Sequence, residues 1–235
     1  MRNLFFLFLS LLAFLDTKAQ LESLIVDYQE GGPSITINIY RPREELEQTR
    51  IHYFTDGNKL LDNGILESLI EHETSPAYYV FVSTIDPVSG LDHRNEYFFC
   101  NPVYLEFFEE QVLPLVEQHL GLSFLPAQRS LIGVSFGGLN AAYFSGINES
   151  FQKYVLLSPV TYPCKIFKEK VVFSTNQDLK IFLSTGTKDA ELYVRELEAL
   201  YRSKGYTLET IQTEGGHDFE NWLGQMTRVM QFLSE

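Results

Sequence analysis

Short apolar runs, separated by polar segments that contain glycine or proline, recur along the chain beyond residue 30. Runs without alternation, such as Tyr79–Val82, favour strands that are buried on both faces of a sheet. These runs are rich in Ile, Val, Phe and Tyr, which are typical of strands. The predicted strands are Ser34–Tyr40, Ile51–Thr55, Tyr78–Ser83, Ser130–Val134, Tyr154–Leu157, Lys180–Ser184 and Thr207–Thr213.

Helical patterns lie between these strands. Asn101 and Pro102 are typical of an N-cap and a first helical residue, and apolar residues follow at helical spacing from Leu105 to Val116. Pro114 conflicts with this interpretation, because proline removes one helix hydrogen bond and bends or ends the helix.

Two more helices are expected towards the C-terminus. One begins near Ala190 and ends at Gly205, and the last places an apolar stripe over Phe219–Leu233. Strands that alternate with helices predict a mostly parallel α/β sheet with helices on both faces. Without repeats or long linkers, residues 20–235 are expected to form a single domain.

The first nineteen residues follow a different pattern. Arg2 precedes the apolar run Leu4–Leu15, and small residues follow at Thr17 and Ala19. The run is shorter than the roughly 20 residues that a membrane span needs. We therefore expect a signal peptide, residues 1–19, that is cleaved after Ala19, and an exported protein without stable membrane association. An uncleaved membrane anchor is the alternative.

Composition narrows the function classes. The 235 residues include 18 Lys and Arg against 31 Asp and Glu, for a formal net charge of −13. Such an acidic surface repels phosphate backbones, which argues against a nucleic-acid partner. The two cysteines are too few for a disulfide-framework mini-protein or a four-thiolate zinc site. In an oxidising compartment Cys100 and Cys164 could pair, or they could be two small buried side chains, and the sequence leaves both open.

One motif carries clear chemistry. Gly133-x-Ser135-x-Gly137 lies directly between a predicted strand and a predicted helix. A serine on such a sharp turn projects its hydroxyl from the sheet edge, and side chains at the flanking glycines would collide with the neighbouring backbone. The amide of Phe136 would begin the helix and point towards a developing oxyanion. A tightly packed Gly/Ser turn without catalytic function is the alternative.

A serine nucleophile needs a base and an acid that orients it. Among the five histidines, His217 lies in a glycine-flanked loop after the last predicted strand, as the chain order Ser, acid, His requires. Asp189 is the first carboxylate after the preceding strand and is our preferred acid, although it could instead cap the next helix. Glu191 is the reserve. A second oxyanion donor is expected in the loop after an early strand, near Gly57 or Asn58.

Several segments together resemble the esterase D family of α/β-hydrolases, which contains enterochelin, feruloyl and acetyl-xylan esterases, S-formylglutathione hydrolases and the antigen 85 proteins. They are Tyr53–Gly57, Arg94–Tyr97, Phe107–Leu115, Gly133–Gly138 and Gly215–Trp222.

The resemblance implies an α/β-hydrolase fold and roles for individual residues. Ser135 would be the nucleophile, His217 the base and Asp189 or Glu191 the acid, while Phe136 and the Gly57 region would supply oxyanion donors. The proline within the helix would be a tolerated feature of the family. The loop 158–167 would overhang the pocket and set specificity.

The expected function is hydrolysis of a small acyl or aryl ester, such as an acylated sugar or a siderophore. An acyltransferase that uses the same site is the alternative, and a non-catalytic binding protein would not need all three triad residues. Because the sequence contains no metal-ligand cluster, phosphate loop or dinucleotide fingerprint, we expect no cofactor.

Overall fold

A computed structural model describes residues 21–42, 49–189 and 191–235. The described residues form one eight-stranded sheet with the order β1-β2-β4-β3-β5-β6-β7-β8. The strands are β1 (Leu21–Asp27), β2 (Ser34–Tyr40), β3 (Arg50–Phe54), β4 (Ala77–Val82), β5 (Arg129–Val134), β6 (Lys153–Leu157), β7 (Lys180–Gly186) and β8 (Thr207–Thr213). β2 is antiparallel to β1 and β4, and the remaining neighbours are parallel. This mostly parallel α/β sheet agrees with the fold class expected from the sequence.

The predicted strands agree closely with the observed ones. β2 and β8 have the predicted bounds, and β3, β4, β5 and β6 each begin one residue earlier than predicted. The sequence pattern did not predict β1, an edge strand whose residues alternate between exposed and half-buried. Because it pairs only with β2, the strand lacks the continuous apolar run of the central strands.

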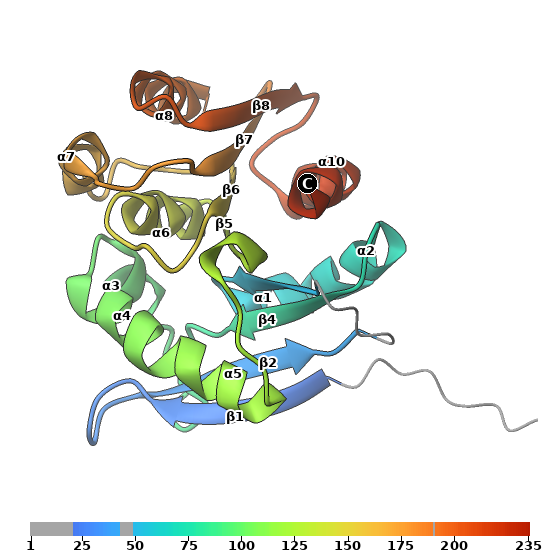
Figure 1. Cartoon of the computed structure of the whole chain (residues 1–235), viewed down its shortest axis with the longest axis vertical. Helices are drawn as coiled ribbons and strands as arrows, with labels where there is room; N and C mark the ends of the chain where they lie inside the picture. The colour runs from blue at the N-terminus through green and yellow to red at the C-terminus, as the bar shows by residue number, and fades with distance from the viewer. Residues whose placement is uncertain (1–20, 43–48, 190) are drawn as a thin grey trace, which may run out of the picture.

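Helices cover both faces of the sheet (Figure 1). They are α1 (Gly57–Asp62), α2 (Ile65–Glu71), α3 (Arg94–Phe98), α4 (Pro102–Phe107), α5 (Leu113–Leu120), α6 (Phe136–Ser145), α7 (Ile166–Phe173), α8 (Glu191–Ser203), α9 (Phe219–Leu223) and α10 (Met226–Ser234). One apolar cluster joins one sheet face to α3–α8, and a second joins the other face to α1, α2, α9 and α10. The sheet is thus enclosed between two apolar layers.

The helix predicted around Pro114 has a different internal structure. The Asn101 side chain caps α4 by accepting the Val103 amide at 2.9 Å. A π-helical turn over Phe108–Val112 then separates α4 from α5. Pro114 lies in the first turn of α5, directly after this π-helical turn, which already interrupts the regular hydrogen bonding of the helix. The widened turn is the physical reason that proline is tolerated there.

The C-terminal helix predicted over Phe219–Leu233 is wrong as a single helix. It consists of α9 and α10, which are separated at Gly224 and Gln225. The Gln225 amide bonds the Trp222 carbonyl, three residues back, which tightens the chain and redirects it between the two helices.

Cys100 and Cys164 form a disulfide, with their Cα atoms 6.2 Å apart. The bridge connects the segment between α3 and α4 to the segment that precedes α7.

The predicted signal peptide and Gln20, the first residue of the predicted domain, lie outside the described residues. Within the described ranges, no helix is long and apolar enough to cross a membrane.

Candidate active site

Ser135 lies on the turn between β5 and α6 in a strained conformation, with φ 57° and ψ −116°. A Cβ atom at Gly133 would lie 2.0 Å from the Gly137 carbonyl oxygen. One at Gly137 would lie 2.5 Å from Thr55 Oγ1, a side chain rather than the backbone contact that we expected. Both glycines are therefore required by close packing, and the turn presents the half-buried serine at the carboxyl edge of the sheet.

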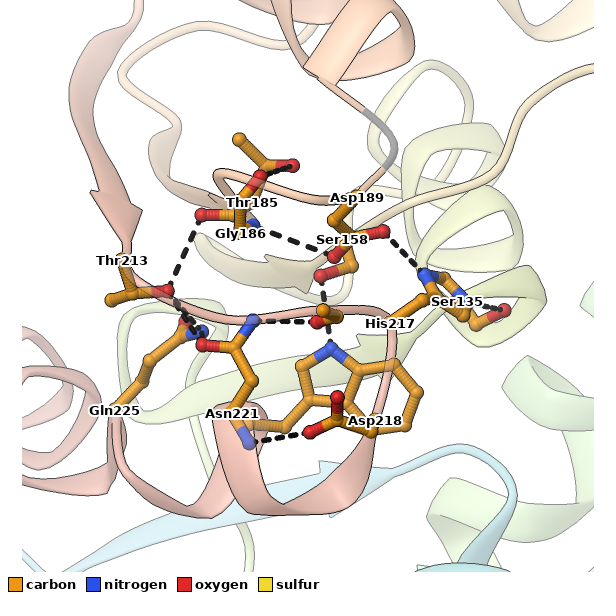
Figure 2. Close-up of polar contacts among 12 residues, drawn as sticks. Ser135, Ser158, Thr185, Gly186, Asp189, Thr213, His217, Asp218, Asn221 and Gln225 are labelled. Atoms are coloured by element: carbon orange, nitrogen blue, oxygen red, sulfur yellow. Dashed lines mark hydrogen bonds and ion pairs between the residues drawn. The ribbon is translucent and has the colours of Figure 1, made fainter.

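His217 lies between Asp189 and Ser135 (Figure 2). Its Nε2 is 2.9 Å from Ser135 Oγ, and its Nδ1 is 2.6 Å from Asp189 Oδ1. The Asp189 side chain is 1% exposed, whereas that of His217 is 36% exposed. The three residues follow the carboxyl ends of β5, β7 and β8, which meet at one edge of the sheet. The arrangement can pass a proton from the serine to the imidazole.

Glu191, the reserve acid, lies elsewhere. It is the first residue of α8, and its Oε1 accepts a hydrogen bond from Arg195 Nε at 2.9 Å. This pair is four residues apart on the exposed helix surface. The structure therefore brings Asp189, and not Glu191, to the imidazole.

Asn221 holds the loop that carries His217. Its Nδ2 donates to the Gly216 carbonyl at 2.8 Å, and its Oδ1 accepts from Thr213 Oγ1 at 2.6 Å. The backbone amide of Asn221 donates to Asp218 Oδ1 at 2.9 Å, and Asp218 thereby caps α9. Sequence reasoning missed Asn221; the only local signal was Asp218 directly before the apolar run, which marks a helix start.

The expected oxyanion donors begin two helices at the same edge of the sheet. Phe136 is the first residue of α6, and Gly57 and Asn58 are the first two of α1, so the second donor lies in a helix start that follows the short turn of Thr55 and Asp56. Amides in a first helical turn have no carbonyl partner within their own helix. β3 and β5 are paired neighbours, and the Thr55 hydroxyl lies against Gly137. Both helix starts thus lie close to the serine turn.

An ion pair reinforces this junction. Arg94 Nε lies 2.7 Å from both carboxylate oxygens of Asp56, the residue before α1. The guanidinium carbon lies 4.9 Å from the centroid of the Phe136 ring. Burial raises the pKa of the Asp56 carboxyl, and the neighbouring Arg94 charge opposes this increase. Asp56 and Arg94 therefore connect the start of α1 with the start of α6.

Part of the backbone strain lies at the same edge of the sheet, at Asp56, Ser135 and Ser158. In the described part of the chain, five non-glycine residues have positive φ: Asp56, Cys100, Ser135, Ser158 and Asp178. Ser158 follows β6, and its Oγ accepts a hydrogen bond from Trp222 Nε1 at 2.9 Å. Strained residues persist only where their surroundings hold them, and they are concentrated in functional sites.

Comparisons with known proteins identify the family of the chain. A sequence profile of the family described as "Putative esterase" matches residues 29–233. The chain belongs to this esterase family of α/β-hydrolases. Membership supports ester hydrolysis as the activity of the chain. No curated protein sequence gives a significant match.

Solved structures share the fold of this esterase. The BES protein from Bacillus cereus is 18% identical, with a TM-score of 0.74 over 92% of this chain and 95% of that one. Enterochelin esterase from Shigella flexneri is 22% identical, with a TM-score of 0.76 over 92% of this chain and 58% of that one. The siderophore hydrolase EstB from Aspergillus nidulans is 16% identical, with a TM-score of 0.72 over 91% of this chain and 93% of that one. The esterase thus spans little more than half of the Shigella chain.

Proposed function

We propose that the protein is a serine carboxylesterase with Ser135 as nucleophile, His217 as general base and Asp189 as the acid that orients it. The observation that carries this proposal is the continuous hydrogen-bond chain from Asp189 Oδ1 through the imidazole to Ser135 Oγ. The strained turn at Ser135 adds support, because such a turn exposes the hydroxyl at the edge of the sheet.

In this proposal the reaction has two halves. His217 Nε2 takes the Ser135 proton as Oγ attacks the ester carbonyl, and Asp189 stabilises the imidazolium that forms. The amides of Phe136 and of Gly57 or Asn58 donate to the oxyanion. The imidazolium then protonates the departing alcohol, which leaves an acyl-enzyme. Water deprotonated by His217 attacks that ester, and the imidazolium returns the proton to Ser135 Oγ as the carboxylic acid is released.

The substrate class that we propose is a small acyl or aryl ester, with an acylated sugar or a siderophore as candidates. Support comes from structural neighbours that are described as an enterochelin esterase, a ferulic acid esterase and a siderophore hydrolase.

The test combines covalent labelling with kinetics. A fluorophosphonate should phosphonylate Ser135 with loss of fluoride, and peptide mass spectrometry should find the label there. Ser135→Ala should lower kcat for p-nitrophenyl esters about 10⁴-fold or more. Ser203→Ala, which removes an exposed hydroxyl on α8, is the control and should keep full activity. A folded Ser135→Ala protein with near-normal activity would refute the proposal. An added acceptor alcohol distinguishes hydrolysis from acyl transfer.

We also propose export with cleavage after Ala19. The basic residue and short apolar run of the N-terminus support it, and so does the Cys100–Cys164 disulfide, because such bonds persist in oxidising compartments. Mass spectrometry of the protein from its source cell should find an N-terminus at or near Gln20. Intact Met1 on the mature protein would contradict this.

A further inference from the structure

Four aromatic rings form a row beside Ser135. Phe136, the next residue, contacts Phe99, with ring centroids 5.1 Å apart. Phe136 also contacts Tyr162, with ring centroids 5.9 Å apart, and Tyr162 in turn contacts Tyr193 at 6.4 Å. The row is continuous although its members come from four separate segments of the chain.

The segment that carries Tyr162 is attached directly to the serine turn. The Val160 amide donates to the Ser135 carbonyl at 3.1 Å, and a Cβ atom at Gly138 would lie 2.9 Å from Pro159. Tyr162 follows two residues after this attachment and is 60% exposed. An exposed aromatic side chain so close to a nucleophile has a ring surface free to contact a substrate.

The Cys100–Cys164 disulfide lies close in the chain to two rings of this row, Phe99 and Tyr162. Cys100 follows Phe99 directly and has a φ of 56°, and Cys164 lies two residues beyond Tyr162. The bridge therefore connects the two segments whose rings, Phe99 and Tyr162, both contact Phe136. Without it, only noncovalent contacts would hold residues 161–165 over the start of α6. A covalent connection restricts the positions that the Tyr162 ring can adopt relative to Phe136.

We propose that Tyr162 determines specificity for esters with an aromatic group and that the Cys100–Cys164 disulfide is its positioning element. The Tyr162 ring packs on the aromatic group of the substrate, whether that group belongs to the acid or to the alcohol. An ester without an aromatic group gains nothing from this contact. This inference rests on the proposed esterase function.

The test uses three esters: ethyl benzoate, phenyl acetate and ethyl acetate. Tyr162→Ala should raise KM about tenfold for the aromatic ester that is recognised, because ring stacking and buried apolar area are lost. The same variant should leave kcat/KM for ethyl acetate within about twofold of the wild-type value. Tyr162→Phe should restore the wild-type KM, because the ring and not the hydroxyl makes the contact. The ethyl benzoate and phenyl acetate results distinguish an aromatic acid from an aromatic alcohol.

The disulfide is tested by the double variant Cys100→Ser with Cys164→Ser, which leaves no lone thiol. It should raise KM for the same aromatic ester and leave kcat for ethyl acetate unchanged. Phe173→Ala, at an 81% exposed ring on α7, is the matched control and should change none of these constants. If the double variant does not fold, the Tyr162→Ala and Tyr162→Phe pair decides the role of the ring.

The inference is overturned if Tyr162→Ala affects all three esters equally or none of them. An unchanged KM in a folded double variant overturns the positioning role of the disulfide. Failure of the proposed function looks different, because the wild-type protein would then hydrolyse no ester and Ser135 would take no fluorophosphonate label.

Discussion

The indole of Trp222 meets the imidazole of His217 edge to face, with ring centroids 5.0 Å apart and an interplanar angle of 88°. The same indole donates from Nε1 to the buried Ser158 Oγ at 2.9 Å. One side chain on α9 therefore connects the loop of His217 with the turn that follows β6. The imidazole is held by this ring as well as by the Asp189 carboxylate.

Trp222→Phe should lower both stability and kcat, because a buried hydroxyl loses its donor and the imidazole loses its packing surface. Loss of the hydrogen bond should lower the free energy of unfolding by about 1–3 kcal/mol, measured by urea titration. Ser158→Ala should be less destabilising in the Trp222→Phe background than in the wild type. Strictly additive effects would mean that Trp222 and Ser158 are not coupled.

Asp189→Asn should lower kcat by up to about 10⁴-fold, because the amide favours the wrong imidazole tautomer. Glu191→Gln is the matched control and should have little effect, because Glu191 pairs only with Arg195 among the described contacts. Steady-state kinetics of both variants with one p-nitrophenyl ester are sufficient. The reverse order of effects would assign the acid role to Glu191.

His52 should make the protein sensitive to acid. Burial and the positive charges of Lys153 and Arg50 lower its pKa from 6.5 to about 3. The unfolded chain therefore binds a proton below pH 6.5 that the folded protein does not accept until about pH 3. The free energy of unfolding should fall as the pH decreases through this window, by on the order of 4 kcal/mol.

Urea titrations at pH 7, 5 and 4 measure this dependence. His52→Phe, which keeps a flat ring against Tyr79, should flatten it. His72→Gln, at the end of α2, is the control for the loss of any histidine and should keep the wild-type slope. An unchanged slope in His52→Phe would assign the acid sensitivity to other groups.

Arg94→Met should destabilise the protein by about 3–5 kcal/mol, because it leaves the buried Asp56 carboxylate without its cation. Adding Asp56→Asn should recover part of that loss by removing the uncompensated charge. Arg195→Met breaks an ion pair on the exposed surface of α8 and should have little effect. Equal effects of the two arginine substitutions, measured by thermal unfolding, would contradict this interpretation.

The parts of the site that are predictable from sequence are those whose signals are local. Gly133, Ser135 and Gly137 are close in the chain, and their spacing directly expresses the packing of one turn. His217 could be selected because its loop follows the last strand of an alternating pattern. Asp189 and Glu191 are two residues apart in the chain, so the sequence could not decide between them. The structure distinguishes them by their partners, which are His217 for Asp189 and Arg195 for Glu191.

The remaining features depend on contacts that no local pattern encodes. Arg94 and Asp56 are 38 residues apart in the chain, and Trp222 and Ser158 are 64 residues apart. Neither contact could be inferred before the fold was known. Cys100 and Cys164 are also 64 residues apart in the chain, and the sequence left their pairing open. The π-helical turn before Pro114 likewise was not visible in the residue pattern, which predicted one helix interrupted by a proline.

The position of β8 at the end of the sheet has a consequence for inactivation. β8 pairs only with β7 among the described strands, and the loop that carries His217 begins where β8 ends. Terminal strands open locally at lower free energy than central ones. Ser135, next to the central β5, should keep its backbone geometry while His217 is already displaced. In hydrogen-exchange experiments, β8 amides should therefore exchange before those of β5, and catalysis should cease at denaturant concentrations where most of the fold persists.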